Sequence, residues 1–119
     1  MHIVKEIISE DCFDENFIKE YTLDQKLTKE WIDYLKQFGE TTCLSSLDHP
    51  FYSFDKKYFF TIKGILDEDK IKVIFRRNNM DKTMEFFKAL IENFDDWRVN
   101  IEKLKEMENN ILKNMNLNQ

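Results

Sequence analysis

The chain has 119 residues, 42% of them apolar and 14% aromatic, and its formal net charge is −5. These values describe one folded domain with enough apolar side chains for a core, and they exclude a disordered chain. Only two glycines and one proline occur, so a Gly-rich phosphate-binding loop is excluded as well.

The N-terminal residues lack the signals that direct a chain to or through a membrane. They contain neither a basic start with a long apolar run nor a small-residue cleavage site, and no apolar run approaches the roughly 18 residues that span a bilayer. Cys12 and Cys43 are more typical of free thiols in a reducing compartment than of a disulfide. We therefore expect a cytoplasmic protein without a membrane partner.

The first elements are predicted from residue type and spacing. Residues 3–8 are rich in β-branched side chains, which favours a strand, although their apolar positions also repeat at helical spacing. Candidate N-caps at residues 9–11 are followed by Phe17, Ile18 and Tyr21 on one helical face, together with Phe13. This pattern predicts a helix of two or three turns that ends near Tyr21.

The best-defined short element is a helix over residues 23–38. Thr22 and Gln25 have the spacing of a capping box, and apolar side chains follow at steps of three and four. Gly39 stands where a helix commonly ends in the left-handed conformation. Periodicity is then lost around Pro50, the only proline, and a short strand fits residues 41–46.

Two strands are predicted at 57–65 and 70–76, joined as a β-hairpin across an acidic turn. Every second side chain of a strand points to the same face. The face expected to be buried carries Tyr58, Phe60, Ile62, Ile71, Val73 and Phe75. The opposite, amphipathic face carries Phe59, Thr61, Lys63, Lys72, Ile74 and Arg76.

The C-terminal third carries an apolar stripe that keeps one helical phase from residue 80 to residue 115, broken only by Thr83 and Glu108. As a single helix it would be on the order of 50 Å long, more than so small a domain can cover. Asp95 and Asp96 are suitable caps for a separate last helix, whereas the unbroken phase favours continuity. The sequence leaves one helix or two open over 81–115.

Together these elements predict one α+β domain over residues 1–119. Its small antiparallel sheet is built on the β-hairpin, and amphipathic helices near 23–38 and 81–94 pack on one face of the sheet. A terminal helix occupies 97–115, within a C-terminal segment of 97–119 that serves association.

No combination of side chains in the sequence predicts catalysis, a metal site or a cofactor. The residues of ligand type are Cys12, Cys43, His49 and His2, but their spacing matches no zinc site. Asp48 and His49 are adjacent, and adjacent side chains seldom form an acid–base pair. No base is identified for Cys43 as a nucleophile. The acidic runs at 67–69 and 95–96 lack the spacing of a calcium loop.

The function favoured by the sequence is a non-enzymatic adaptor, regulator or assembly factor that binds a protein partner, or a second copy as a homodimer. The aromatic first half of the stripe suits a globular core, whereas its aliphatic second half resembles a helix–helix seam. The residues predicted to bind the partner are Trp97, Ile101, Leu104, Ile111 and Met115.

The alternative function is binding of nucleic acid by the basic outer face of the hairpin. Formal charge is uneven, with −7 over 1–55, +4 over 56–77 and −2 over 78–119. A basic middle segment favours an acidic partner or neutralisation within the chain. Cations next to an aromatic suit single-stranded nucleic acid, although the pI near 5.1 argues against it. The residues of this alternative are Phe59, Lys63, Lys72, Arg76 and Arg77.

Overall fold

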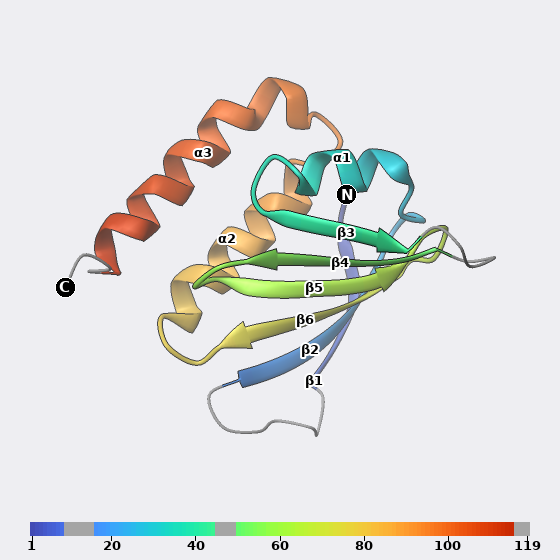
Figure 1. Ribbon diagram of the computed structural model, residues 1–119, viewed down its shortest axis with the longest axis horizontal. Helices are drawn as coiled ribbons and strands as arrows, with labels where there is room; N and C mark the ends of the chain where they lie inside the picture. The colour runs from blue at the N-terminus through green and yellow to red at the C-terminus, as the bar shows by residue number, and fades with distance from the viewer. Residues whose placement is uncertain (9–15, 45–49, 116–119) are drawn as a thin grey trace.

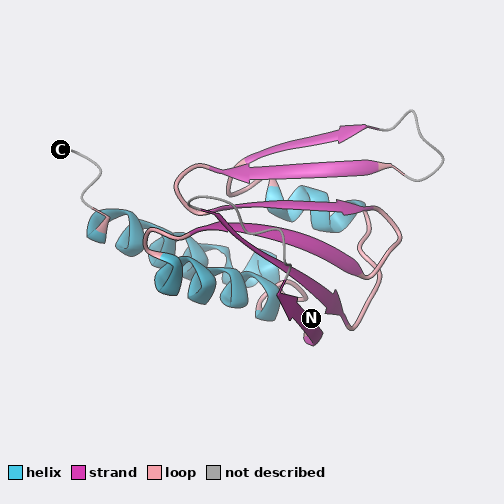
Figure 2. Ribbon diagram, turned by 90° about the horizontal axis from the view of Figure 1, so that it is seen from below, coloured by secondary structure: helices cyan, strands magenta, loops and turns pink. Residues whose placement is uncertain are grey.

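The computed structural model describes residues 1–8, 16–44 and 50–115. These residues form a six-stranded antiparallel sheet in the order β1-β2-β6-β5-β4-β3, with three helices packed against one face (Figures 1 and 2). The predicted α+β class is therefore confirmed. The strands are β1 (Ile3–Ile8), β2 (Asn16–Leu23), β3 (Glu40–Leu44), β4 (Phe51–Lys56), β5 (Phe60–Ile65) and β6 (Lys70–Arg76). The helices are α1 (Lys29–Leu35), α2 (Met80–Glu92) and α3 (Trp97–Asn114).

The predicted hairpin is present as β5 and β6, paired with Phe60 opposite Phe75 and Ile62 opposite Val73. These four inward side chains are at most 1% exposed. The predicted faces are wrong for Tyr58 and Phe59, which lie in the turn before β5. Tyr58 is 42% exposed, whereas Phe59 packs in the core with its ring 5.4 Å from that of Phe86. Side chains alternate between the two faces only within a strand. Because Phe59 lies in the turn, that alternation does not determine which face its side chain points to.

The helix predicted to end near Tyr21 is wrong within the described residues, because 16–23 form strand β2. This strand lies between β1 and β6, with Phe17 opposite Phe75 and Tyr21 opposite Ile71. Two neighbouring strands provide main-chain hydrogen bonds on both sides, and this pairing outweighs the local helical spacing. The strand predicted at 3–8 is confirmed as β1.

The helix predicted over 23–38 is shorter than expected. It begins at Lys29 and ends at Leu35, and the predicted capping box is wrong because Thr22 lies in β2 while Gln25 donates to Asp95 (3.0 Å). Gly39 does not adopt a left-handed φ. It is needed instead for close approach, since a Cβ there would lie 2.7 Å from the Asp55 carbonyl oxygen.

The sheet has two strands more than the sequence predicted, namely β2, which was expected to be a helix, and β4. Strand β3 confirms the prediction near 41–46, whereas β4, which pairs with β3 and β5, was missed. Tyr52 and Phe54 do alternate inward on β4, but Phe51 obscures the pattern and the third inward residue is a lysine, Lys56.

The apolar stripe forms two helices. Helix α2 ends at Glu92 and α3 begins at Trp97, and α3 folds back beside α2 (Figure 1). The whole chain is 44 Å in its longest dimension, which is shorter than one unbroken helix of this segment. No helix in the described part of the chain is long and apolar enough to cross a membrane.

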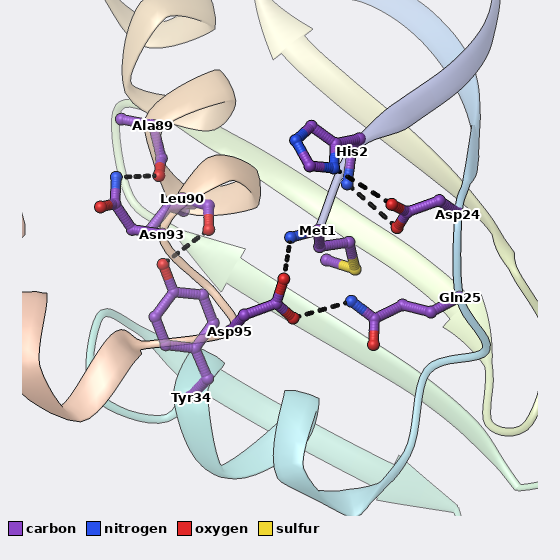
Figure 3. A network of polar contacts seen from close by, with 9 residues as sticks. All are labelled: Met1, His2, Asp24, Gln25, Tyr34, Ala89, Leu90, Asn93 and Asp95. Atoms are coloured by element: carbon purple, nitrogen blue, oxygen red, sulfur yellow. Dashed lines mark hydrogen bonds and ion pairs between the residues drawn. The ribbon is translucent and has the colours of Figure 1, made fainter.

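Tertiary contacts mark the break between α2 and α3 (Figure 3). The Asp95 carboxylate accepts hydrogen bonds from the amino group of Met1 and from Gln25 Nε2, while Asn93 Nδ2 donates to the Ala89 carbonyl (2.8 Å). Asp96 occupies the N-cap position of α3, but its side chain makes no capping hydrogen bond. The second aspartate therefore marks the start of the helix without capping it through its side chain.

Candidate functional site

The sheet has one face covered by helices and an opposite face that we call the open face (Figure 2). Register places alternate residues of β1, β2, β6 and β5 on it. All of them are half-buried or exposed, whereas the inward residues of β6, and those of β5 apart from Gly64, are buried. The open face is defined here by Lys5, Ile7, Ile18, Glu20, Lys63, Ile65, Lys70, Lys72, Ile74 and Arg76.

The open face is strongly basic although the chain as a whole is acidic. It contains five cations and one acid, Glu20, and Asp55 is a further outward acid on β4. Lys63 lies directly opposite Lys72 in the β5–β6 register. Side chains so placed have Cβ atoms about 5 Å apart, and like charges there destabilise the pair. Among the described residues, no carboxylate lies within ion-pairing distance of these five cations.

A shallow hollow of about 470 Å³ lies on this face. Its lining contains four cations from three strands, Lys5 on β1, Lys63 on β5, and Lys70 and Lys72 on β6, and two acids, Glu20 and Glu68. Aliphatic side chains of Ile7 and Ile65 complete part of the lining. The hollow therefore offers positive charge beside an apolar surface, and this combination suits an anionic ligand that also carries apolar groups.

Three of the residues predicted to bind nucleic acid, Lys63, Lys72 and Arg76, lie together on the open face. Arg77 is exposed just beyond the end of β6. Phe59, which was expected to stack on bases, is fully buried on the other side of the sheet. Among the described strand residues the outward aromatic is Phe51 on β4, and it is half-buried.

The residues predicted to bind a partner through the C-terminal helix are used within the chain itself. Trp97, Leu104 and Ile111 are 9%, 1% and 7% exposed, and Ile101 and Met115 are half-buried against the same core. Because α3 folds back beside α2, most of this half of the stripe is covered within the domain, and partner binding by these residues stays a prediction.

A buried ion pair, absent from the sequence prediction, joins α3 to the sheet. Lys56 Nζ donates to the Phe38 carbonyl (2.7 Å) and to the carboxylate of Glu108, and it lies 4.9 Å from the centre of the Phe59 ring. Burial lowers the pKa of the Lys56 amino group. Glu108 was visible as the polar interruption of the stripe, but only the fold identifies Lys56 as its partner.

The other polar candidates that the structure describes lie apart from one another. Cys43 is exposed on the edge strand β3, and the ring Nδ1 of His2 contacts Asp24 at 3.1 Å. The run 67–69 forms the turn between β5 and β6. No cluster of three or more metal-ligand side chains occurs in the part of the chain that the structure describes. Cys12 and the pair Asp48 and His49 lie outside the described residues.

The fold and this surface define a class: an α+β protein with one open, basic sheet face. Comparisons with models of protein families, with curated proteins and with solved structures found no match. A function for the chain therefore rests on its own surface chemistry.

Proposed function

We propose that the chain is a cytoplasmic, non-enzymatic interaction protein that binds a protein partner through the open face of its sheet. The observation that carries the proposal is the Lys63–Lys72 pair, two facing cations without a carboxylate of the described residues within ion-pairing distance. An acidic partner would remove their repulsion on binding, so complementary charge favours association at this place.

Burial favours the open face over the C-terminal helix as the docking surface. A partner could reach Leu104 and Ile111 only if α3 left the domain. Exposing two such side chains costs roughly 1.5–3 kcal/mol each, and the Lys56–Glu108 pair would also separate. The open face needs no such rearrangement. Self-association through α3 is for the same reason a weaker proposal than binding at the sheet.

Nucleic acid is the second candidate because the same cations could contact phosphates. Single-stranded nucleic acid also stacks its bases on aromatic side chains. Phe59 lies in the core, and among the described strand residues the outward aromatic of the sheet is the half-buried Phe51 on β4. A protein partner therefore suits the face better.

Affinity capture from native lysate tests the proposal. One bait is the unaltered chain, the second carries Lys63→Glu, Lys72→Glu and Arg76→Glu, and the third is a matched control with Lys29→Glu, Lys36→Glu and Lys88→Glu on the exposed helix surface. Circular dichroism establishes that all three baits are folded. We expect partner proteins to be retained by the unaltered and control baits, to be lost from the open-face variant, and to survive nuclease treatment.

Equal recovery by all three baits would show that the open face is not the docking surface. Recovery that disappears after nuclease treatment would instead support nucleic acid as the ligand.

A further inference from the structure

We infer that the partner contributes an extended acidic segment that lies along β6, with acidic side chains on Lys70, Lys72 and Arg76 and an aliphatic side chain on Ile74. This inference rests on the proposed function and specifies the chemistry of the partner at the same surface. Its basis is the order of the outward residues along β6 and the residues that flank them.

The spacing of β6 matches that of an extended ligand. Its outward residues in order are Lys70, Lys72, Ile74 and Arg76. Residues that share one face of a strand are about 6.6 Å apart, and alternate side chains of an extended peptide have the same spacing. A segment of about seven residues would thus meet the whole row, with acids at positions 1, 3 and 7 and an aliphatic residue at position 5, or in the reverse order.

The neighbouring strands strengthen this pattern. Ile18 on β2 lies opposite Ile74 and extends the apolar contact sideways. Lys63 on β5 lies opposite Lys72 and doubles the positive charge there. Glu20 lies opposite Lys72 on the β2 side, where it would repel an incoming carboxylate. An acidic group is therefore directed to the side of Lys72 that faces Lys63.

The aliphatic centre of the row distinguishes a polypeptide from nucleic acid. Ile18 and Ile74 are half-buried, and both can contact the apolar side chain of a peptide. Bases bind preferentially to flat aromatic or guanidinium groups, and the row along β6 offers one such group, Arg76, at its end. Exposed charge pairs are individually weak and are screened by salt, so we expect micromolar or weaker binding that depends on ionic strength.

Fluorescence anisotropy with labelled peptides tests the inference on the full chain. The first peptide has glutamate at positions 1, 3 and 7, isoleucine at position 5 and serine elsewhere. A second peptide has glutamine in place of each glutamate, a third has serine in place of isoleucine, and a ten-residue oligothymidylate represents nucleic acid. We expect the first peptide to bind at least tenfold more tightly than the glutamine peptide and the oligonucleotide.

Variants of the chain assign the contacts. We expect Lys63→Ala with Lys72→Ala to raise the Kd of the first peptide about tenfold, whereas the control Lys29→Ala with Lys36→Ala leaves the Kd unchanged. We expect Ile74→Thr to abolish the preference for the isoleucine peptide over the serine peptide while binding of the serine peptide persists.

Three results would overturn the inference: equal binding of the glutamate and glutamine peptides, insensitivity to the Lys63 and Lys72 substitutions, or tighter binding of the oligonucleotide. If these occur while lysate proteins are still lost from the open-face variant, the partner binds this face by other chemistry and the proposed function stands. If the lysate proteins are not lost, the proposed function itself fails.

Discussion

The buried amino group of Lys56 shows how a single residue can determine where a helix packs. It satisfies the Phe38 carbonyl and Glu108 at once, and three phenylalanine rings lie within about 6 Å of it. Both side chains of the ion pair are close to one-tenth exposed. A buried charge without its partner is costly, whereas replacing both charges by apolar groups is often neutral.

Replacing Glu108 by leucine should therefore lower the free energy of unfolding by about 3 kcal/mol, since it leaves Lys56 charged and without its carboxylate partner. The double variant Lys56→Met with Glu108→Leu should recover most of that loss. Urea unfolding followed by circular dichroism measures both. If the double variant is no more stable than Glu108→Leu alone, the buried pair does not account for the effect.

At the scale of elements, α3 completes the core and does not extend as a free arm. Leu104 on its inner side is 1% exposed, while Val99 on the same helix is 83% exposed. The Trp97 indole donates to Glu30 in the first turn of α1 (2.9 Å). The helix is thereby held at its first turn and along its inner face.

The two aliphatic positions of α3 provide a matched comparison. Leu104→Ala should lower the unfolding free energy by about 2–5 kcal/mol through lost burial and the remaining cavity. Val99→Ala should change it by less than about 0.5 kcal/mol. Chemical denaturation of both variants checks the expectation. Similar small effects at the two positions would mean that α3 is not part of the cooperative core.

Carboxylates that join different elements make the stability of the fold sensitive to acid. The hydrogen bond from the Met1 amino group, followed by that from Gln25, lowers the pKa of Asp95 below its ordinary value of 3.8. A backbone hydrogen bond from His2 lowers the pKa of Asp24, and hydrogen bonds from Arg98 and Trp97 lower the pKa of Glu30. These carboxylates bind protons more readily in the unfolded chain than in the fold. They therefore stabilise the fold at pH values above their pKa in the unfolded chain.

Stability should accordingly decline as the pH falls below about 4 and through the lowered folded pKa values. Asp95→Asn should be less stable than the unaltered chain at pH 7, and the difference should shrink as the pH approaches 2. Unfolding free energies measured across this range test the assignment. A difference that is constant with pH would show that the Asp95 charge is not involved.

At the scale of the whole molecule, the chain is acidic overall and concentrates cations on one sheet face. This arrangement keeps the Lys63–Lys72 repulsion in the free protein, where it lowers stability. We propose that the repulsion is retained because the same charges bind the acidic partner. Replacing Lys63 or Lys72 should then raise the stability of the fold and weaken binding of the partner.

Lys63→Glu should test this opposition. It places an acid opposite Lys72, so we expect it to raise the unfolding free energy by roughly 0.5–1 kcal/mol and to weaken binding of the acidic peptide. Thermal unfolding and anisotropy on the same preparation measure both effects. A loss of both stability and binding would indicate general damage to the sheet.

The sequence predicted the fold correctly where the pattern lay within one element, and it failed where a turn or a distant strand determined the structure. Alternation in β5 and β6 predicted their inward side chains because both strands continue in register. The same reasoning failed for Phe59, since a turn ends the alternation before β5. It also failed for β2, whose apolar spacing fits a helix but whose neighbours β1 and β6 supply strand hydrogen bonds.

The candidate site was predicted in part for the same reason. Lys63, Lys72 and Arg76 were assigned to one face from strand period alone, and register confirms that they share it. Lys5 and Lys70 were not included. Lys5 comes from a distant part of the chain that joins this surface only through β2, and Lys70 begins the strand, where the turn made its direction uncertain from sequence.

By itself the sequence determined the α+β class, the hairpin and the period of the C-terminal stripe, because side-chain alternation and helical spacing are properties of neighbouring residues. Only the tertiary structure decided that the stripe bends at 93–96, that Lys56 pairs with Glu108, and that the three described helices leave one sheet face uncovered. Those outcomes depend on residues far apart in the chain, and their contacts form only when the strands pair and α3 packs on the core.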